Sequence, residues 1–105
     1  MKSITPKELK TRIDSGDNIQ IIDVREIHEA DICTINGLLI PMATILENTH
    51  QIKKDIPVII HCRTGKRAAA VILTLEKQFN FDNLYNLEGG ILQYADDVDP
   101  SLEHY

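Results

Sequence analysis

A short apolar run leads into a glycine-containing loop and then into an amphipathic helix, and this succession constrains the fold more than any other segment. The run from residue 57 to residue 61 has the length and β-branched content of a buried strand. Residues 68–79 carry Ala68, Ile72, Leu75 and Phe79 at intervals of four, three and four, which is a helical stripe. Residues 62–67 join the two. The chain therefore contains a strand, a tight turn and a helix in that order.

The rest of the chain repeats the alternation of strands and helices. Thr5, Pro6 and Glu8 form the start of a helix, with Thr5 as the cap and Glu8 at the capping-box position, and Gly16 ends it. Further strands are predicted at residues 19–24, 37–41 and 84–87, and further helices at residues 43–53 and 91–98. Such alternation predicts an α/β fold with a parallel sheet that is covered by helices on both faces. Residues 1–105 are expected to form a single domain.

Composition excludes several classes of function. The 43% hydrophobic and 26% charged content is typical of a globular domain, so disorder is not expected. The net charge of −5 argues against general binding to nucleic acid, which needs a basic face. No apolar run approaches the roughly 20 residues of a membrane helix, and the N-terminus lacks the apolar segment of a secretory signal. With two cysteines and no export signal, a cytoplasmic location is expected.

The segment between the strand and the helix has the chemistry of an anion cradle. Cys62 stands at its start, and backbone N–H groups at a helix start together with nearby cations stabilise a thiolate, the reactive form of cysteine. Gly65 gives the backbone freedom where a positive φ or a close approach is needed. The sequence predicts Cys62 as a nucleophile, held in a loop that binds the reacting anion and consists of Arg63, Thr64, Gly65, Lys66 and Arg67.

Two further charged residues are expected near this loop. Asp23 and Arg25 end the strand at residues 19–24, and carboxyl ends of parallel strands share one edge of a sheet, so this pair is a candidate support for the loop. Arg67 is expected either to pair with a carboxylate such as Asp23 or Glu26 or to face an anionic ligand. His61 precedes Cys62 on a strand and therefore points to the opposite face, so no base role is assigned to it.

Several motifs, spread from about residue 4 to residue 98, occur in an order known from one family. They are Thr5-Pro6-Lys7-Glu8-Leu9, Asp23-Val24-Arg25-Glu26 with Glu29, Ile40-Pro41, Cys62-Arg63-Thr64-Gly65-Lys66-Arg67 and Leu87-Glu88-Gly89-Gly90-Ile91. Together they resemble a single-domain form of the rhodanese-like sulfurtransferases. The resemblance implies an α/β fold with three layers, in which a central and mostly parallel sheet of about five strands has helices on both faces. The family often has Gly-His-Ile where this chain has Cys33 to Leu38, and a tryptophan where Tyr94 stands. The first departure has a resemblance of its own. Asp31-Ile32-Cys33 followed by Leu39-Ile40-Pro41, with Val98-Asp99-Pro100-Ser101-Leu102 at the end, is similar to rhodanese domains fused to adenylyltransferases of sulfur-carrier pathways.

The resemblance implies a two-step reaction. Cys62 would take a sulfane sulfur from thiosulfate or a protein persulfide and pass it to a thiophilic acceptor, with Arg63 and Lys66 guiding an anionic donor. The donor would be a small sulfur anion or a cysteine desulfurase, and a ubiquitin-like sulfur carrier is a candidate acceptor. This thiol exchange chemistry requires no metal and no organic cofactor.

Other functions remain open at this stage. A related cysteine phosphatase would carry five residues between its cysteine and arginine, whereas Cys62 and Arg67 enclose four. The chain could also be a non-catalytic interaction module, or a redox protein that cycles a disulfide between Cys33 and Cys62. Cys33 lies between isoleucines without a cation cluster, so a packed core thiol is the favoured interpretation. His28, His50 and His104 share no metal-ligand spacing and are expected on the surface, as is the acidic tail from Asp96 onward.

Overall fold

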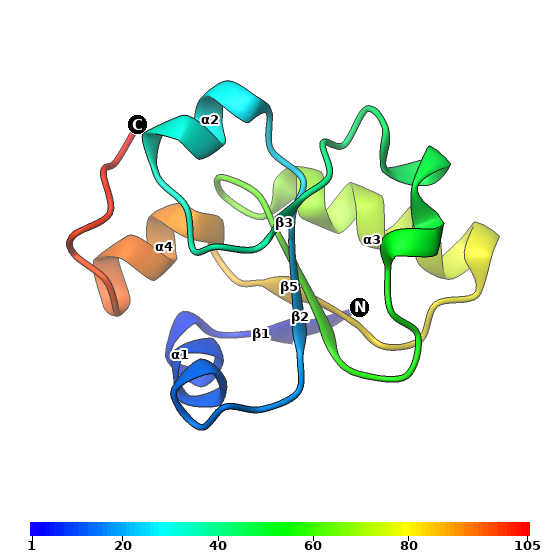
Figure 1. Cartoon of the computed structure of the whole chain (residues 1–105), viewed down its shortest axis with the longest axis horizontal. Coiled ribbons are helices and arrows are strands. Elements are labelled where there is room, and N and C mark those ends of the chain that lie inside the picture. Colours follow the sequence, from blue (N-terminus) through cyan, green and yellow to red (C-terminus); the bar gives the residue numbers. More distant parts are fainter.

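The computed structural model describes all 105 residues, and its centre is a five-stranded sheet in which every neighbouring pair is parallel. The strands lie in the order β1-β5-β4-β2-β3 (Figure 1). Their bounds are β1 (Lys2–Ile4), β2 (Gln20–Asp23), β3 (Leu38–Leu39), β4 (Val58–His61) and β5 (Leu84–Leu87). All four residues of the central strand β4 are buried, as predicted for the apolar run that precedes Cys62.

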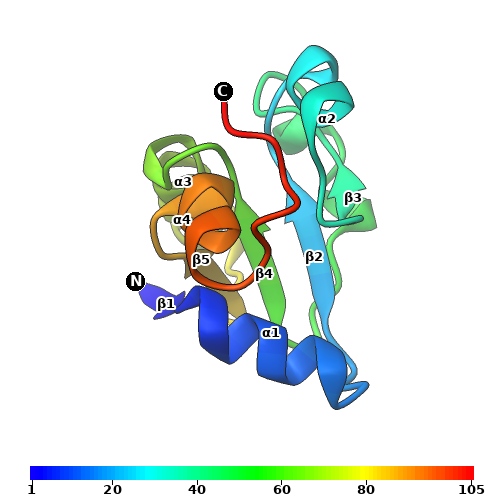
Figure 2. The same cartoon turned by 90° about the vertical axis from the view of Figure 1, so that its left-hand side faces the viewer.

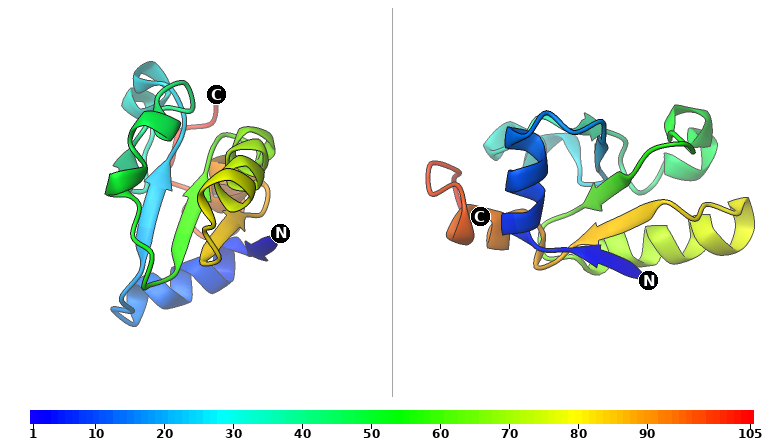
Figure 3. Two further views of the ribbon diagram at one scale, coloured as in Figure 1. Left: turned by 90° about the vertical axis from the view of Figure 1, so that its right-hand side faces the viewer. Right: turned by 90° about the horizontal axis from the view of Figure 1, so that it is seen from below.

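Helices cover both faces of this sheet and complete the predicted α/β, three-layer fold. They are α1 (Pro6–Asp14), α2 (Ile27–Ile32), α3 (Lys66–Phe79) and α4 (Gly90–Asp97). On one face α3 packs on the sheet around Ile60 and Ile72, together with the segment at residues 44–52 (Figure 3). On the other face α1 and α4 pack on the sheet around Leu9, Ile59 and Tyr94 (Figure 2). The sheet therefore separates two apolar clusters.

The first helix forms for the reasons visible in the sequence. The N–H of Glu8 donates to Thr5 Oγ1 and the N–H of Thr5 donates to Glu8 Oε1, both over 3.1 Å, which is the predicted capping box. The backbone of Gly16 has a φ of +69° just after the helix, as expected for its end. Helix α3 begins at Lys66, two residues before the predicted stripe, so that Lys66 and Arg67 belong to its first turn.

The prediction of an α-helix over residues 43–53 is wrong. The segment forms two short 3-10 helices, η1 (Ile45–Glu47) and η2 (Thr49–Gln51). The side-chain amide of Asn48 donates to the Thr44 carbonyl over 2.8 Å, and that carbonyl is the acceptor that the Asn48 N–H would use in an α-helix. The Asn48 N–H donates to Ile45 instead, which tightens the turn.

Two elements were not predicted. The strand β1 adds to the outer edge of β5 and is too short for a clear alternation of polar and apolar residues (Figure 3). The helix α2 has six residues and follows directly after Arg25. Its sequence signal was the pair Glu26 and Glu29, because the Glu26 N–H donates to Glu29 Oε1 over 3.1 Å at the helix start. Helix α2 matters because it carries Glu29 to the cysteine loop.

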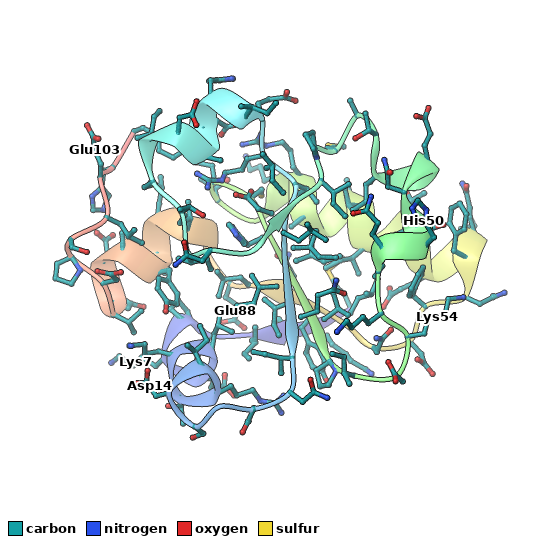
Figure 4. All side chains as sticks on the ribbon, viewed as in Figure 1. Lys7, Asp14, His50, Lys54, Glu88 and Glu103 are labelled. Atoms are coloured by element: carbon teal, nitrogen blue, oxygen red, sulfur yellow. The ribbon has the colours of Figure 1, made fainter.

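The longest helix, α3, has 14 residues. None of the helices combines the length and the apolar character that a membrane span requires. Exposed side chains such as Lys7, His50, Lys54 and Glu103 point outward from the molecule (Figure 4). His28 and His104 are exposed as well, as predicted.

Candidate functional site

Cys62 is the first residue after β4, and its sulfur lies at the N-terminal end of α3. Cys62 is 1% exposed. Its Sγ accepts hydrogen bonds from the backbone N–H of Gly65 over 3.1 Å and from that of Ala68 over 3.4 Å. Gly65 caps the helix with a φ of +104°, a conformation that residues with a Cβ rarely adopt. The predicted freedom at Gly65 is therefore used to turn N–H groups toward the sulfur, which favours negative charge on it.

The start of α4 holds the loop from the other side. The N–H of Ile91 donates to the Cys62 carbonyl over 2.9 Å, and the N–H of Leu92 donates to the Arg63 carbonyl over 3.2 Å. A Cβ added at Gly90 would lie 2.3 Å from the Arg63 carbonyl oxygen, so only glycine allows this approach. The glycine pair that follows β5 is thus part of the site, because it lets α4 dock against the backbone of the loop.

Arg67 forms an ion pair with Glu29 of α2. Its two terminal guanidinium nitrogens donate to the two carboxylate oxygens over 2.7 and 2.8 Å. The hydrogen bonds from Arg67 hold the pKa of Glu29 well below its usual value, and the same carboxylate raises the pKa of Arg67. The expected pairing of Arg67 with a carboxylate is confirmed, but the partner is Glu29 and not Asp23 or Glu26. Asp23 is occupied by another cation, and Glu26 caps α2 at the exposed surface, whereas Glu29 lies one turn further along the helix.

Asp23 and Arg25 form a buried pair at the carboxyl end of β2, beside the end of β4. Arg25 Nη2 donates to Asp23 Oδ2 over 2.8 Å and Nε donates to Oδ1 over 3.0 Å. Burial opposes the charge on Arg25, but hydrogen bonds to Asp23 and Tyr105 outweigh it and raise the pKa of Arg25. Arg25 also donates to the carbonyls of Glu29 and Cys33 at either end of the last turn of α2. The pair is linked to the cysteine loop through α2 and through the Tyr105 hydroxyl, to which Arg25 Nη1 donates over 3.0 Å.

The other predicted loop residues face solvent or lie near the surface. Arg63, Thr64 and Lys66 are exposed, and their side chains form no hydrogen bond or ion pair within the chain. The Arg63 guanidinium lies over the ring of Tyr105, 4.9 Å from its centroid. Because Arg67 is paired with Glu29, Arg63 and Lys66 are the loop cations that remain free for an anion. Tyr105 was missed because its proximity to the loop is purely tertiary.

Two buried side chains complete the surroundings. His61 is fully buried, and desolvation lowers its pKa, which keeps the imidazole neutral. Its Nε2 lies 4.0 Å from Asp23 Oδ2, and neither ring nitrogen has a hydrogen-bond partner. Cys33 is buried and free, as is Cys62. The burial of Cys33 agrees with the expected core thiol, and Arg25 Nη1 lies 3.9 Å from its sulfur.

Known proteins share this sequence pattern and this architecture. Residues 5–97 match the family model of the rhodanese-like domain. The chain is 35% identical to the probable adenylyltransferase/sulfurtransferase MoeZ of Mycobacterium tuberculosis over 98% of its own length and 27% of that protein. It is 30% identical to the adenylyltransferase and sulfurtransferase UBA4 of Candida glabrata over 87% of its length and 24% of that protein. It therefore spans about a quarter of these curated relatives.

A solved structure agrees over the whole chain. The rhodanese-like domain protein from Staphylococcus aureus superposes with a TM-score of 0.82 at 37% identity, and the match covers 100% of this chain and 99% of that one. The loop from Cys62 to Arg67 lies within the matched region of the family. The chain belongs to the rhodanese-like domain family.

Proposed function

We propose that this chain is a sulfurtransferase that carries a sulfane sulfur as a persulfide on Cys62. The observation that carries the proposal is the cradle around Sγ, in which the N–H groups of Gly65 and Ala68 already point at the sulfur. Four residues separate Cys62 from Arg67, so the ring of N–H groups is small and suits a single sulfur atom better than a tetrahedral phosphate. The sulfurtransferase names of the relatives support the same class of reaction.

The chemistry follows in two balanced steps. The Cys62 thiolate attacks the outer sulfur of thiosulfate, the S–S bond of the donor breaks, and sulfite leaves with the electron pair of that bond. A thiolate or cyanide acceptor then attacks the outer sulfur of the persulfide, and the Cys62 thiolate is the leaving group. The N–H groups at the start of α3 stabilise the negative sulfur in both steps. Arg63 and Lys66 attract the anionic donor.

The partners follow from the same chemistry and from the relatives. A protein persulfide, such as that of a cysteine desulfurase, can replace thiosulfate as the donor because the attacked atom is the same. The relatives combine adenylyltransferase and sulfurtransferase in one chain. We therefore propose a ubiquitin-like sulfur carrier with an adenylylated C-terminus as the acceptor. With this acceptor the outer sulfur of the Cys62 persulfide attacks the carbonyl carbon of the acyl adenylate, and AMP leaves. A second thiol then attacks the Cys62 sulfur, which releases the carrier thiocarboxylate and leaves a disulfide between that thiol and Cys62.

Intact mass spectrometry tests the proposal. After incubation with thiosulfate the wild type should gain the mass of one sulfur, and dithiothreitol should remove it. The Cys62→Ala variant should gain nothing, whereas Cys33→Ala should behave as the wild type. Equal sulfur uptake by Cys62→Ala would assign the chemistry to another residue. Hydrolysis of aryl phosphates faster than sulfur transfer would favour the phosphatase alternative.

A further inference from the structure

Tyr105 connects the buried charge network with the exposed cation of the cysteine loop. Its hydroxyl donates to Glu29 Oε2 over 2.7 Å and accepts from Arg25 Nη1 over 3.0 Å. Its ring lies below the Arg63 guanidinium at 4.9 Å, within the range of a cation–π contact. One side chain therefore contacts all three of these charged groups.

The segment that carries Tyr105 is tied to the fold along its length. After α4 the chain turns back, with Val98 and Leu102 packed against the cluster that contains Leu9 and Tyr94. His104 Nε2 lies 2.7 Å from Asp96 Oδ1 in the last turn of α4. The segment then runs beside the sheet toward α2, and the chain ends near that helix (Figure 2). Tyr105 is thus brought to the loop by packing and polar contacts.

Arg63 depends on this ring for its position. Its backbone carbonyl is held by the Leu92 N–H, but its guanidinium has no hydrogen bond or ion pair, and its contact is the Tyr105 ring. The ring in turn is oriented by its hydroxyl, which shares the Glu29 carboxylate with Arg67. A long, exposed arginine without this contact would sample many rotamers.

We propose that Tyr105 is a positioning residue that holds the Arg63 guanidinium beside the Cys62 cradle and thereby selects anionic sulfur donors over neutral ones. The proposal rests on the proposed function of Cys62 and specifies the class of donor that the site prefers. Exposed cation–π contacts are weak, so loss of the ring should cost about three- to fivefold in the affinity for a small anion. The reaction step itself does not involve Tyr105, so kcat should change little.

The kinetic test uses thiosulfate as the donor and cyanide as the acceptor. Tyr105→Ala should raise the KM for thiosulfate about three- to fivefold and leave kcat within about twofold. Tyr105→Phe keeps the ring but loses the hydroxyl bonds, and it should show an intermediate KM. In a double-mutant cycle, Tyr105→Ala should add nothing to Arg63→Gln, because both changes remove the same positioned charge. Additive effects, or a loss confined to kcat, would overturn the proposal.

A second measurement, the alkylation of Cys62, detects the positive charge beside the thiol and does not require sulfur transfer. The rates of Cys62 alkylation by iodoacetate, an anion, and by iodoacetamide, which is neutral, are measured by peptide mass spectrometry, which separates Cys62 from Cys33. The ratio of the two rates should fall about three- to fivefold in both Tyr105→Ala and Arg63→Gln. An unchanged ratio in Tyr105→Ala would overturn the proposal, as would failure of both reagents to reach Cys62 in the wild type.

Lys54→Gln serves as the matched control. Lys54 lies 4.8 Å from the centroid of the Phe81 ring, so the variant removes one stacked cation at the far end of the molecule from the segment that carries Tyr105 (Figure 4). Its KM and its alkylation ratio should equal those of the wild type. The two assays also separate the two proposals. Wild-type protein that acquires no sulfur refutes the function, while a changed alkylation ratio still supports the positioning of Arg63 by Tyr105.

Discussion

The Glu29→Gln variant probes the contact that fixes the first turn of α3. In the wild type the carboxylate accepts two hydrogen bonds from Arg67 and one from the Tyr105 hydroxyl, all between 2.7 and 2.8 Å, and one from the Glu26 N–H over 3.1 Å. Glutamine has nearly the same shape but no charge, and its NH₂ group faces a donor. Removing one partner of a buried ion pair costs about 3–5 kcal/mol. The Arg67 side chain is 33% exposed, so water can solvate the unpaired guanidinium in part. We therefore expect the free energy of unfolding to fall by about 2–3 kcal/mol.

The assay is chemical denaturation at pH 7, supported by thermal unfolding. A loss of about 2–3 kcal/mol should lower the Tm by about 10–15 °C for a domain of this size. Sulfur transfer should fall as well, because the first turn of α3 supplies the N–H of Ala68 to Cys62. Glu47→Gln is the matched control, since Glu47 is exposed and forms no side-chain hydrogen bond or ion pair. The control should stay within about 0.5 kcal/mol of the wild type.

The stability difference between the wild type and Glu29→Gln should depend on pH. Hydrogen bonds from Arg67 lower the pKa of folded Glu29 below the value of 4.5 that applies in the unfolded chain. The stabilisation by the carboxylate is therefore complete above about pH 5 and is lost as the pH falls below 4.5, by about 1.4 kcal/mol per pH unit. The gap between the wild type and Glu29→Gln should narrow over that range. A cost below about 0.5 kcal/mol at pH 7, or a gap that stays constant down to about pH 3.5, would refute the reasoning.

Four further substitutions, in two pairs of test and control, probe the fold around the site. Gly90→Ala places a Cβ 2.3 Å from the Arg63 carbonyl oxygen at a φ of +64°, and it should cost more than about 2 kcal/mol and abolish sulfur transfer. Gly16→Ala is the control, because Gly16 has a similar φ of +69° but no atom near its Cβ position. It should lower the free energy of unfolding by only about 1 kcal/mol, which is the backbone strain of a left-handed residue. Equal losses for the two variants in chemical denaturation would contradict the close approach of α4. Leu75→Ala removes a fully buried side chain of α3 and should cost about 2–5 kcal/mol, whereas Leu73→Ala, which is 56% exposed, should stay within about 0.5 kcal/mol by the same measurement.

Local sequence predicted the elements that are stabilised by their own residues. The capping box at Thr5 and Glu8, the apolar run of β4 and the stripe of α3 each contain the groups that stabilise them. The same local information placed Cys62 and Gly65 at a strand-to-helix turn, because the residues that form the cradle are contiguous. The alternation of strands and helices also predicted that the strands are parallel, but not their order in the sheet.

Local sequence failed where a side chain competes with the backbone or where packing supplies the support. Asn48 takes a carbonyl from the backbone and converts an expected helix into 3-10 turns. The strand β1 exists because the edge of β5 accepts it.

The partners in the charge network depend on tertiary structure alone. Several carboxylates near the sheet edge were equally plausible partners for Arg67, and only the docking of α2 selects Glu29. Tyr105 lies 76 residues from Glu29 in the sequence, and nothing local indicates their contact. The sequence by itself therefore determined the sulfur cradle, whose N–H groups belong to one short segment. The tertiary structure decided which side chains hold the cations around it, because those contacts join segments that only folding brings together.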